Sequence, residues 1–228
     1  MTIADNLARI QERMKQAALR CGRQPEEIRL VAVSKTVPPE AIREAVRAGA
    51  AILGENYIQE AREKIALIGT EAEWHFIGHL QSNKAKHAVE LFSLIHSVDR
   101  MPLAEELNKE AGKKNKILPV LIQVNISGEE TKSGIDPAGT RELVQQAALL
   151  PNLSVQGLMT MPPWFVDPED ARPYFRALRK LRDELAGEKI PNVSLKELSM
   201  GMSGDFETAI EEGATLVRIG TAIFGERG

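Results

Sequence analysis

A lysine follows directly after an apolar segment near the start of the chain. Leu30 to Val33 form a short apolar run with two β-branched residues, and Ser34-Lys35-Thr36 come next, before Pro38-Pro39 end the run. A lone lysine at the end of a strand ordinarily marks the point at which the chain reaches solvent. A lysine in a partly desolvated pocket instead has a lowered pKa and attacks carbonyl compounds, with which it forms a Schiff base. Which of the two describes Lys35 depends on the fold around it.

Strand-like apolar runs alternate with amphipathic helical segments along the whole chain. A first helix, with Leu7, Ile10 and Met14 on one face, precedes about eight strands, each followed by a helix or a turn. The strands are expected over residues 28–35, 51–57, 73–79, 94–98, 117–125, 155–161, 195–202 and 216–224, and the helices after them over 39–48, 59–67, 82–92, 101–114, 137–150, 169–185 and 206–212. This pattern predicts a (β/α)8 TIM barrel with an extra N-terminal helix, since such barrels typically have ~250 residues.

One other α/β fold competes with the barrel. An open, doubly wound sheet shows the same alternation, but no Gly-rich dinucleotide fingerprint follows the first expected strand. No linker, repeat or low-complexity segment divides the chain. We therefore expect a single domain over residues 1–228.

The barrel indicates where function lies, because active sites of this fold are found at the C-terminal ends of the strands. Lys35 would then point into the mouth of the barrel from the first strand. Phosphate groups usually bind after the seventh and eighth strands, where small residues follow the apolar runs in LSMGMSGDFETAI and VRIGTAIFG. Backbone amides at the start of the helix in the first segment could bind an anion. A Schiff-base lysine opposite a phosphate site fits a phosphorylated aldehyde, and pyridoxal 5′-phosphate (PLP) is the obvious candidate.

Five segments resemble those of the pyridoxal-phosphate homeostasis proteins, a family of PLP-binding proteins of bacteria and eukaryotes. They are VAVSKT, GENYIQE, WHFIGHLQSNK, LSMGMSGDFETAI and VRIGTAIFGER, and the resemblance extends over essentially the whole chain. It implies a fold-type III PLP barrel, similar to the N-terminal domain of alanine racemase, in which Lys35 matches the Schiff-base lysine. It also implies that Ser199, Gly220 and Thr221 hold the phosphate, with Met200 and Ser203 in the same loop.

Three further residues are placed beside the cofactor ring. Arg218 matches the arginine that faces the pyridine nitrogen in the family. A guanidinium cannot accept a proton, so such a partner favours an unprotonated ring nitrogen and a weaker electron sink than an aspartate partner would give. Asn56 and His79 are expected beside the ring or its 3-hydroxyl because both lie at strand ends.

Each of these side chains also has an ordinary structural explanation. Arg218 could belong to an ion pair at the barrel mouth, and Asn56 could cap the helix that follows it. The spacing of His75 and His79 is not one that indicates a metal site, and His96 is interpreted as a surface or core histidine. The sequence has no Cys/His cluster, so we expect no metal.

Composition excludes several classes of partner. Hydrophobic residues make up 43% and charged residues 27% of the chain, and the net charge is −3. No apolar stretch approaches the roughly 20 residues that span a bilayer. The charges are interspersed, without a basic block, so neither a membrane nor a nucleic acid is expected as a partner. Cys21 is the only cysteine, and the N-terminus lacks the pattern of a signal peptide, so we expect a cytoplasmic protein without an internal disulfide.

Two functions fit a PLP site of this kind. The favoured one is a carrier or regulator in intracellular vitamin B6 homeostasis, which holds PLP on Lys35, has no strong catalytic activity and passes the cofactor to apo forms of PLP-dependent enzymes. The alternative is a PLP-dependent amino-acid racemase, which needs two bases on opposite faces of the substrate carbanion. In alanine racemase the second base is a tyrosine positioned with the help of a second domain and a partner subunit, and here the only tyrosines are Tyr57 and Tyr174.

A weak racemase-like activity stays open at this point. A third function, a lysine aldolase acting on a sugar phosphate, uses the same Lys35 and phosphate site without a cofactor. Since no second, dimerising domain is expected, we also expect a monomer.

Overall fold

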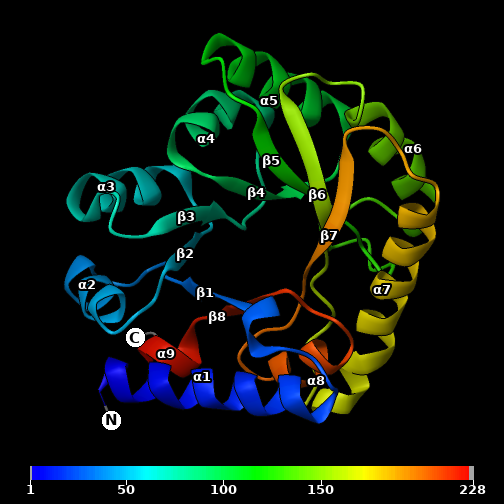
Figure 1. Cartoon of the computed structure of the whole chain (residues 1–228). Helices are drawn as coiled ribbons and strands as arrows, with labels where there is room; N and C mark the ends of the chain where they lie inside the picture. The colour runs from blue at the N-terminus through cyan, green and yellow to red at the C-terminus, as the bar shows by residue number, and fades with distance from the viewer. Residues whose placement is uncertain (1, 226–228) are drawn as a thin grey trace.

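The computed structural model describes residues 2–225, and at its centre is a closed barrel of eight parallel strands in the order β1 to β8 (Figure 1). The strands are β1 (Arg29–Val33), β2 (Ile52–Glu55), β3 (Glu73–Phe76), β4 (Leu94–Val98), β5 (Leu118–Gln123), β6 (Leu153–Met159), β7 (Val193–Ser199) and β8 (Leu216–Ile219). Pairing of β1 with β8, in the register Arg29↔Leu216 to Ala32↔Ile219, closes the barrel. The predicted (β/α)8 fold is therefore confirmed. The last two residues of the segment VRIGTAIFGER, Glu226 and Arg227, lie outside the described residues.

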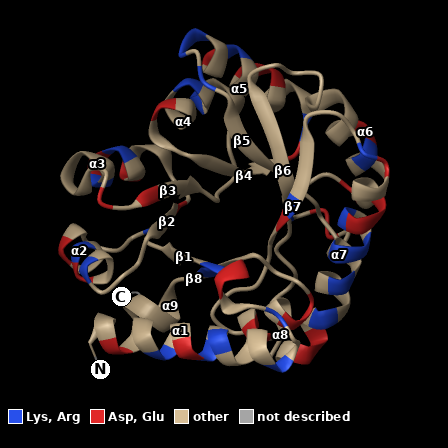
Figure 2. Ribbon diagram, viewed as in Figure 1, with Lys and Arg blue, Asp and Glu red and all other residues tan. Residues whose placement is uncertain are grey.

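Amphipathic helices surround the barrel and bury their apolar faces against it (Figure 1). They are α2 (Pro39–Arg47), α3 (Ile58–Ile68), α4 (Ala85–Leu91), α5 (Met101–Lys113), α6 (Pro137–Ala147), α7 (Arg172–Gly187), α8 (Phe206–Glu211) and α9 (Thr221–Phe224), with short 3-10 turns at Pro25–Glu27, Ser82–Lys84 and Pro168–Ala171. Figure 2 shows basic and acidic residues interspersed over these helices. None of the helices among the described residues is long and apolar enough to cross a membrane.

The predicted N-terminal helix is α1 (Ile3–Arg20). Thr2 caps it in a reciprocal capping box with Asp5, and the predicted apolar face is buried. This face packs against α2, α8 and α9. An ion pair adds to this packing: Arg13 Nη2 lies 2.7 Å from Glu207 Oε2 of α8. The helix thus fixes the two elements that follow the seventh and eighth strands.

The strand predicted over residues 216–224 is wrong in its second half. β8 ends at Ile219, and residues Thr221–Phe224 form α9, with Ile223 fully buried. An apolar run of this length does not distinguish a strand from a helix by periodicity, and Gly220 lets the backbone turn between the two. The seventh strand likewise ends at Ser199, three residues before the predicted end.

The barrel interior contains apolar and polar layers. Val31, Ile52, Leu94, Leu121, Met159 and Leu216 form a cluster separate from the main core, and they face inward because their neighbours along the strands pack under the helices. Polar side chains share this interior: Arg29 Nη2 lies 2.8 Å from Glu197 Oε1, and His75 and His96 are buried in contact with each other. Part of the barrel interior is therefore built from hydrogen-bonded groups.

Candidate functional site

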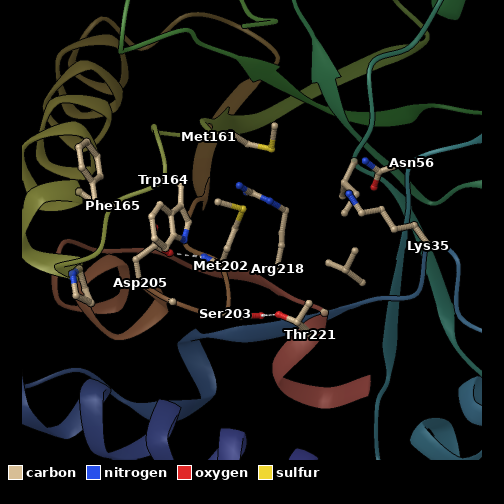
Figure 3. Close-up of a pocket in the computed structure, with 16 residues that line it drawn as sticks. Lys35, Asn56, Met161, Trp164, Phe165, Met202, Ser203, Asp205, Arg218 and Thr221 are labelled. Atoms are coloured by element: carbon tan, nitrogen blue, oxygen red, sulfur yellow. Dashed lines mark hydrogen bonds between the residues drawn. The ribbon is translucent and has the colours of Figure 1, made fainter. Parts of the chain in front are cut away.

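A cavity of about 480 Å³ opens at the C-terminal end of the barrel. This is the end at which active sites of the fold lie, and the volume is in the range of roughly 300–1,000 Å³ typical of small-molecule sites. The cavity is lined by Val33, Lys35, Asn56, Ile77, Met161, Trp164, Phe165, Pro168, Ala171, Met202, Ser203, Gly204, Asp205, Arg218, Gly220 and Thr221. Figure 3 shows Lys35 and Asn56 entering from one side, Trp164 and Asp205 on the other, and Arg218 between them.

The cavity brings together six of the nine residues predicted to bind a cofactor. These six are Lys35, Asn56, Ser203, Arg218, Gly220 and Thr221. His79 lies beyond them, in an adjoining cavity of about 300 Å³ that shares Asn56 and Ile77 with the first. Its side chain is exposed, with Nδ1 3.9 Å from Asp99 Oδ2. His79 therefore flanks the first cavity and is not part of its lining.

Ser199 and Met200 line neither cavity, and their part in holding a phosphate stays a prediction. Ser199 is the last residue of β7, and its fully buried hydroxyl lies inside the barrel, 2.6 Å from Arg218 Nη1. Met200 packs in the core between barrel and helices. The Ser199 hydroxyl faces the interior because Ser199 alternates along β7 with Leu198, which packs in the core under the helices.

Lys35 follows β1, and the peptide groups on both sides of it are held by charged side chains. The carbonyl of Ser34 accepts a hydrogen bond from Lys64 Nζ at 2.5 Å, and the amide of Thr36 donates to Glu60 Oε1 at 2.5 Å. Thr36 has φ of 61°, a left-handed conformation that is uncommon for a non-glycine residue. The surrounding contacts keep the chain in this conformation and so fix the backbone from which Lys35 enters the cavity.

Lys64 is the centre of this arrangement. Besides the Ser34 carbonyl, its ammonium group donates to Glu55 Oε1 at 2.8 Å and to Glu60 Oε1 at 2.6 Å. Glu55 is fully buried and also accepts a hydrogen bond from Ser34 Oγ at 2.7 Å. Burial raises the pKa of Glu55, and the contact with Lys64 opposes that shift. Within residues 2–225, Glu55 Oε2 has no hydrogen-bond partner. The carboxylate therefore depends on Lys64 for compensation of its charge.

Arg218 forms the floor of the cavity. Its guanidinium is almost fully buried and donates through Nη1 to Ser199 Oγ at 2.6 Å and through Nη2 to the Thr160 carbonyl at 2.8 Å. Burial lowers its pKa to about 10, against the attraction of Asp205. Arg218 thus stays charged at neutral pH. The groups to which it donates in the described part of the chain are neutral, and the Asp205 carboxylate acts on it from beyond ion-pair distance.

Hydroxyl groups lie together where the seventh and eighth strands end. Ser203 Oγ is 3.1 Å from Thr221 Oγ1, and it accepts a longer contact of 3.4 Å from the Ala222 amide. The loop that carries Ser203 is closed by a 2.6 Å hydrogen bond from the Met202 amide to Asp205 Oδ1, drawn as a dashed line in Figure 3. Burial raises the pKa of the Asp205 carboxyl. The paired hydroxyls are donors of the kind that bind a phosphate.

Replacement of Gly201 by alanine should destabilise the protein by about 1–3 kcal/mol, because Gly201 has φ of 91° and a Cβ there would lie 2.5 Å from the Ala209 Cβ. The matched control is Gly204→Ala in the same loop, where a Cβ would meet nothing within 4 Å. Urea unfolding of both variants measures the effect. Equal midpoints for the two variants would contradict the expected strain at Gly201.

The loop after β6 forms the outer rim of the cavity. Trp164 lies on this rim and is 79% exposed, whereas the other tryptophan, Trp74, is 5% exposed and donates to the Gly69 carbonyl. Phe165 lines the cavity and packs against Tyr174 of α7, with ring centroids 5.6 Å apart. The two tyrosines of the chain are not part of the lining.

Sequence reasoning missed the histidines beneath the floor. His96 Nδ1 lies 2.8 Å from Ser199 Oγ, and His96 Nε2 lies 3.0 Å from His75 Nδ1. Burial lowers the pKa of His75 to about 3 and that of His96 well below its ordinary value, so both rings are neutral at physiological pH. The available signal was their position on strands β3 and β4, where alternation turns them toward the barrel interior.

This chain matches one known protein family over nearly its whole length. The family model of the alanine racemase N-terminal domain matches residues 5–228. The pyridoxal phosphate homeostasis protein of Aquifex aeolicus is 53% identical over 100% of this chain and 99% of its own length. The protein of the same name from Escherichia coli K12 is 48% identical, covering 99% of this chain and 97% of its own.

Solved structures give the same result. PipY of Synechococcus elongatus, whose structure is described with PLP bound, has a TM-score of 0.85 and 39% identity, covering 98% of this chain and all of its own. Alanine racemase of Corynebacterium glutamicum has a TM-score of 0.75 at 18% identity, with 98% of this chain matching 62% of that enzyme. At this low identity the racemase shows likeness of fold alone.

Proposed function

The chain belongs to the family of the alanine racemase N-terminal domain, and from this premise we propose that it binds PLP in the cavity at the barrel mouth, holds it as a Schiff base on Lys35 and serves intracellular PLP homeostasis. The observation that carries the proposal is the convergence of Lys35, the Ser203 and Thr221 hydroxyls and the Arg218 guanidinium on one cavity. Relatives named as pyridoxal phosphate homeostasis proteins, matched over nearly their full length, support it.

The lining fits the chemical groups of PLP. When bound, PLP supplies an aldehyde that combines with an amine, a phosphate, and a pyridine ring able to act as an electron sink. Lys35 would take the aldehyde, Ser203 and Thr221 the phosphate, and Gly220 would let the backbone approach it closely. Apolar atoms of Val33 and Ile77 are available to the ring faces. Asn56 is proposed beside the ring, and His79 at its outer side in the adjoining cavity.

Lys35 carries the covalent step. Its unprotonated Nζ would add to the aldehyde carbon and form a C–N double bond, and the carbonyl oxygen would leave as water with the two amine hydrogens. The reverse step, addition of water to the C–N double bond, returns the free amine and the aldehyde. The same side chain can therefore take up and release the cofactor.

Arg218 favours storage over catalysis. Its guanidinium is a hydrogen-bond donor only, so it leaves a ring nitrogen beside it unprotonated and weakens the electron sink. Among the described residues that line the cavity there is no tyrosine, histidine or cysteine. We therefore propose a carrier without strong catalytic activity.

A racemase-like enzyme is the second candidate, and one observation favours it. Asp205 lines the cavity with a raised pKa, so its carboxyl could act as an acid or base opposite Lys35. Asp205 Oδ1 accepts a hydrogen bond from the Met202 amide, so we assign to Asp205 the role of closing the loop.

The proposal extends to the setting in which the protein works. We propose a single-domain monomer in the cytoplasm that passes PLP to apo forms of PLP-dependent enzymes. The cavity that opens at the barrel mouth supports such an exchange, because a second protein can reach its rim.

The test combines absorbance, reduction and turnover. PLP added to the purified protein should give the visible band of a Schiff base, and borohydride reduction followed by peptide mapping should find the label on Lys35. Incubation with L- or D-alanine should give no racemisation beyond that of free PLP. A protein that stays colourless would refute PLP binding. Efficient racemisation would refute the carrier function and support the racemase function.

A further inference from the structure

A continuous chain of buried polar groups runs from the cavity floor into the barrel. Arg218 Nη1 contacts Ser199 Oγ at 2.6 Å, Ser199 Oγ contacts His96 Nδ1 at 2.8 Å, and His96 Nε2 contacts His75 Nδ1 at 3.0 Å. His75 Nε2 lies 3.8 Å from Glu73 Oε2, near the opposite end of the strands. The groups come from β8, β7, β4 and β3, so the chain crosses the barrel interior.

The chemistry of the first group fixes the direction of every hydrogen bond after it. Arginine only donates, so Ser199 Oγ is the acceptor, and the Ser199 hydroxyl proton is directed to His96 Nδ1. Because His96 is neutral, its single N–H is then on Nε2 and donates to His75 Nδ1. His75, also neutral, carries its N–H on Nε2, toward the Glu73 carboxylate.

The opposite direction fails on the same contacts. If His96 donated from Nδ1, Ser199 Oγ would accept from both Arg218 and His96, and its own hydroxyl would have no other acceptor in the described part of the chain. Leaving a buried hydroxyl without an acceptor is unfavourable. His75 would also turn a lone pair toward Glu73. Only one set of tautomers satisfies the whole chain.

Other charges in the barrel keep the chain neutral. Arg29 of β1 is paired with Glu197 of β7 at 2.8 Å, and its positive charge further lowers the pKa of His75 and His96. The charge of Arg218 acts in the same sense on His96. Glu73 is the one acidic group within 4 Å of either ring among the described residues.

We propose that Ser199, His96 and His75 are positioning residues that hold the Arg218 guanidinium in one orientation at the cavity floor. Arg218 is almost fully buried without a carboxylate within ion-pair distance, so its position depends on the hydrogen bonds that it donates to neutral acceptors. Ser199 holds Nη1 and Thr160 holds Nη2, and Arg218 at the same time lines the cavity. The link to PLP rests on the proposed function: a fixed Arg218 would determine how tightly the unprotonated ring is held.

The first experiment needs no ligand. Nitrogen-15 NMR of the imidazole rings at pH 7 should show His75 and His96 as neutral rings with the proton on Nε2. A proton on Nδ1 of His96, or a charged ring, would overturn the proposal. This result does not depend on PLP, so it separates failure of the chain from failure of the proposed function.

The second experiment measures PLP affinity in variants that differ in hydrogen-bonding capacity. Ser199→Ala and His96→Leu interrupt the chain, and the PLP dissociation constant should rise roughly tenfold, with a shift in the absorbance band. In His96→Gln, a carboxamide again offers one acceptor and one donor, so affinity should recover relative to His96→Leu. The control is His87→Leu at an exposed histidine.

The outcomes are distinct. Should His96→Leu fail to fold, as judged by circular dichroism, Ser199→Ala carries the test alone. If the wild type binds PLP, and Ser199→Ala matches it in both affinity and spectrum, the positioning role is refuted. If the wild type does not bind PLP, the proposed function fails, and the NMR result still decides whether the chain exists.

Discussion

Lys35→Ala should abolish the visible Schiff-base band that we expect from PLP with the wild-type protein. This variant removes the amine proposed to combine with the aldehyde, and among residues 2–225 no other lysine lines the cavity. The phosphate donors and Arg218 are untouched, so PLP should still bind non-covalently, with a dissociation constant raised by roughly tenfold or more, since about 1.4 kcal/mol corresponds to each tenfold. Absorbance titration and equilibrium dialysis measure the two effects separately.

The control for this variant is Lys180→Ala, which removes a lysine with 78% side-chain exposure on the outer helix α7. Its spectrum and affinity should equal those of the wild type. Both proteins should have the same far-UV circular dichroism, which excludes a folding defect. A full-strength band in Lys35→Ala, fixed by borohydride on another lysine, would show that the covalent site lies elsewhere.

Lys64→Met should lower the free energy of unfolding by about 3–5 kcal/mol and the melting temperature by roughly 6–20 °C, because it leaves the buried Glu55 carboxylate without its cation. The side chains of Lys64 and Glu55 are 6% and 0% exposed, so solvent cannot replace the lost partner. The Ser34 carbonyl also loses its hydrogen bond, which loosens the segment that carries Lys35. Schiff-base formation with PLP should therefore slow in this variant.

The destabilisation by Lys64→Met should depend on pH. Burial already raises the pKa of Glu55 above its ordinary 4.5, and loss of the lysine raises it further. A carboxyl with a raised pKa in the folded state binds its proton more tightly there than in the unfolded chain. The resulting stability is fully present below pH 4.5, the ordinary pKa, and is lost as pH rises through the folded pKa. Between the two pKa values the free energy of unfolding falls by about 1.4 kcal/mol per pH unit. The variant should thus lie closer to wild type at pH 5 than at pH 8.

A surface pair with the same spacing provides the matched control. Lys180 and Glu184 are four residues apart on α7, as Glu60 and Lys64 are on α3, but they are exposed and 3.9 Å apart. Lys180→Met should cost no more than about 1 kcal/mol. Equal melting temperatures for the two methionine variants, or a difference that does not change with pH, would contradict the assigned role of Lys64.

The sequence predicted the fold and most of the cavity for a physical reason. Alternating runs of strand and helix type specify a (β/α)8 barrel, and the barrel by itself gathers distant strand ends at one face. Lys35 and Arg218, which are 183 positions apart, could therefore be placed in one site without any contact information. Family resemblance added the chemical roles.

What the sequence could not give is the direction in which single side chains point. The motif that contains Ser199 predicts a phosphate contact, but only the atomic positions show that its hydroxyl lies in the barrel interior, 2.6 Å from Arg218 Nη1. The cluster of Lys64 with Glu55 is equally invisible, because it joins a strand to the helix after it and requires the crossing geometry. Both depend on atomic positions that no local pattern specifies.

Trp164 gives the cavity a fluorescence signal of its own. The chain has two tryptophans, and only this one lines the cavity rim, while Trp74 is enclosed beside α3. Indole emission depends on exposure to water and is quenched by energy transfer to a nearby acceptor that absorbs at the emission wavelengths, as PLP does. Entry and departure of PLP can therefore be followed in real time from the emission of Trp164, without a label.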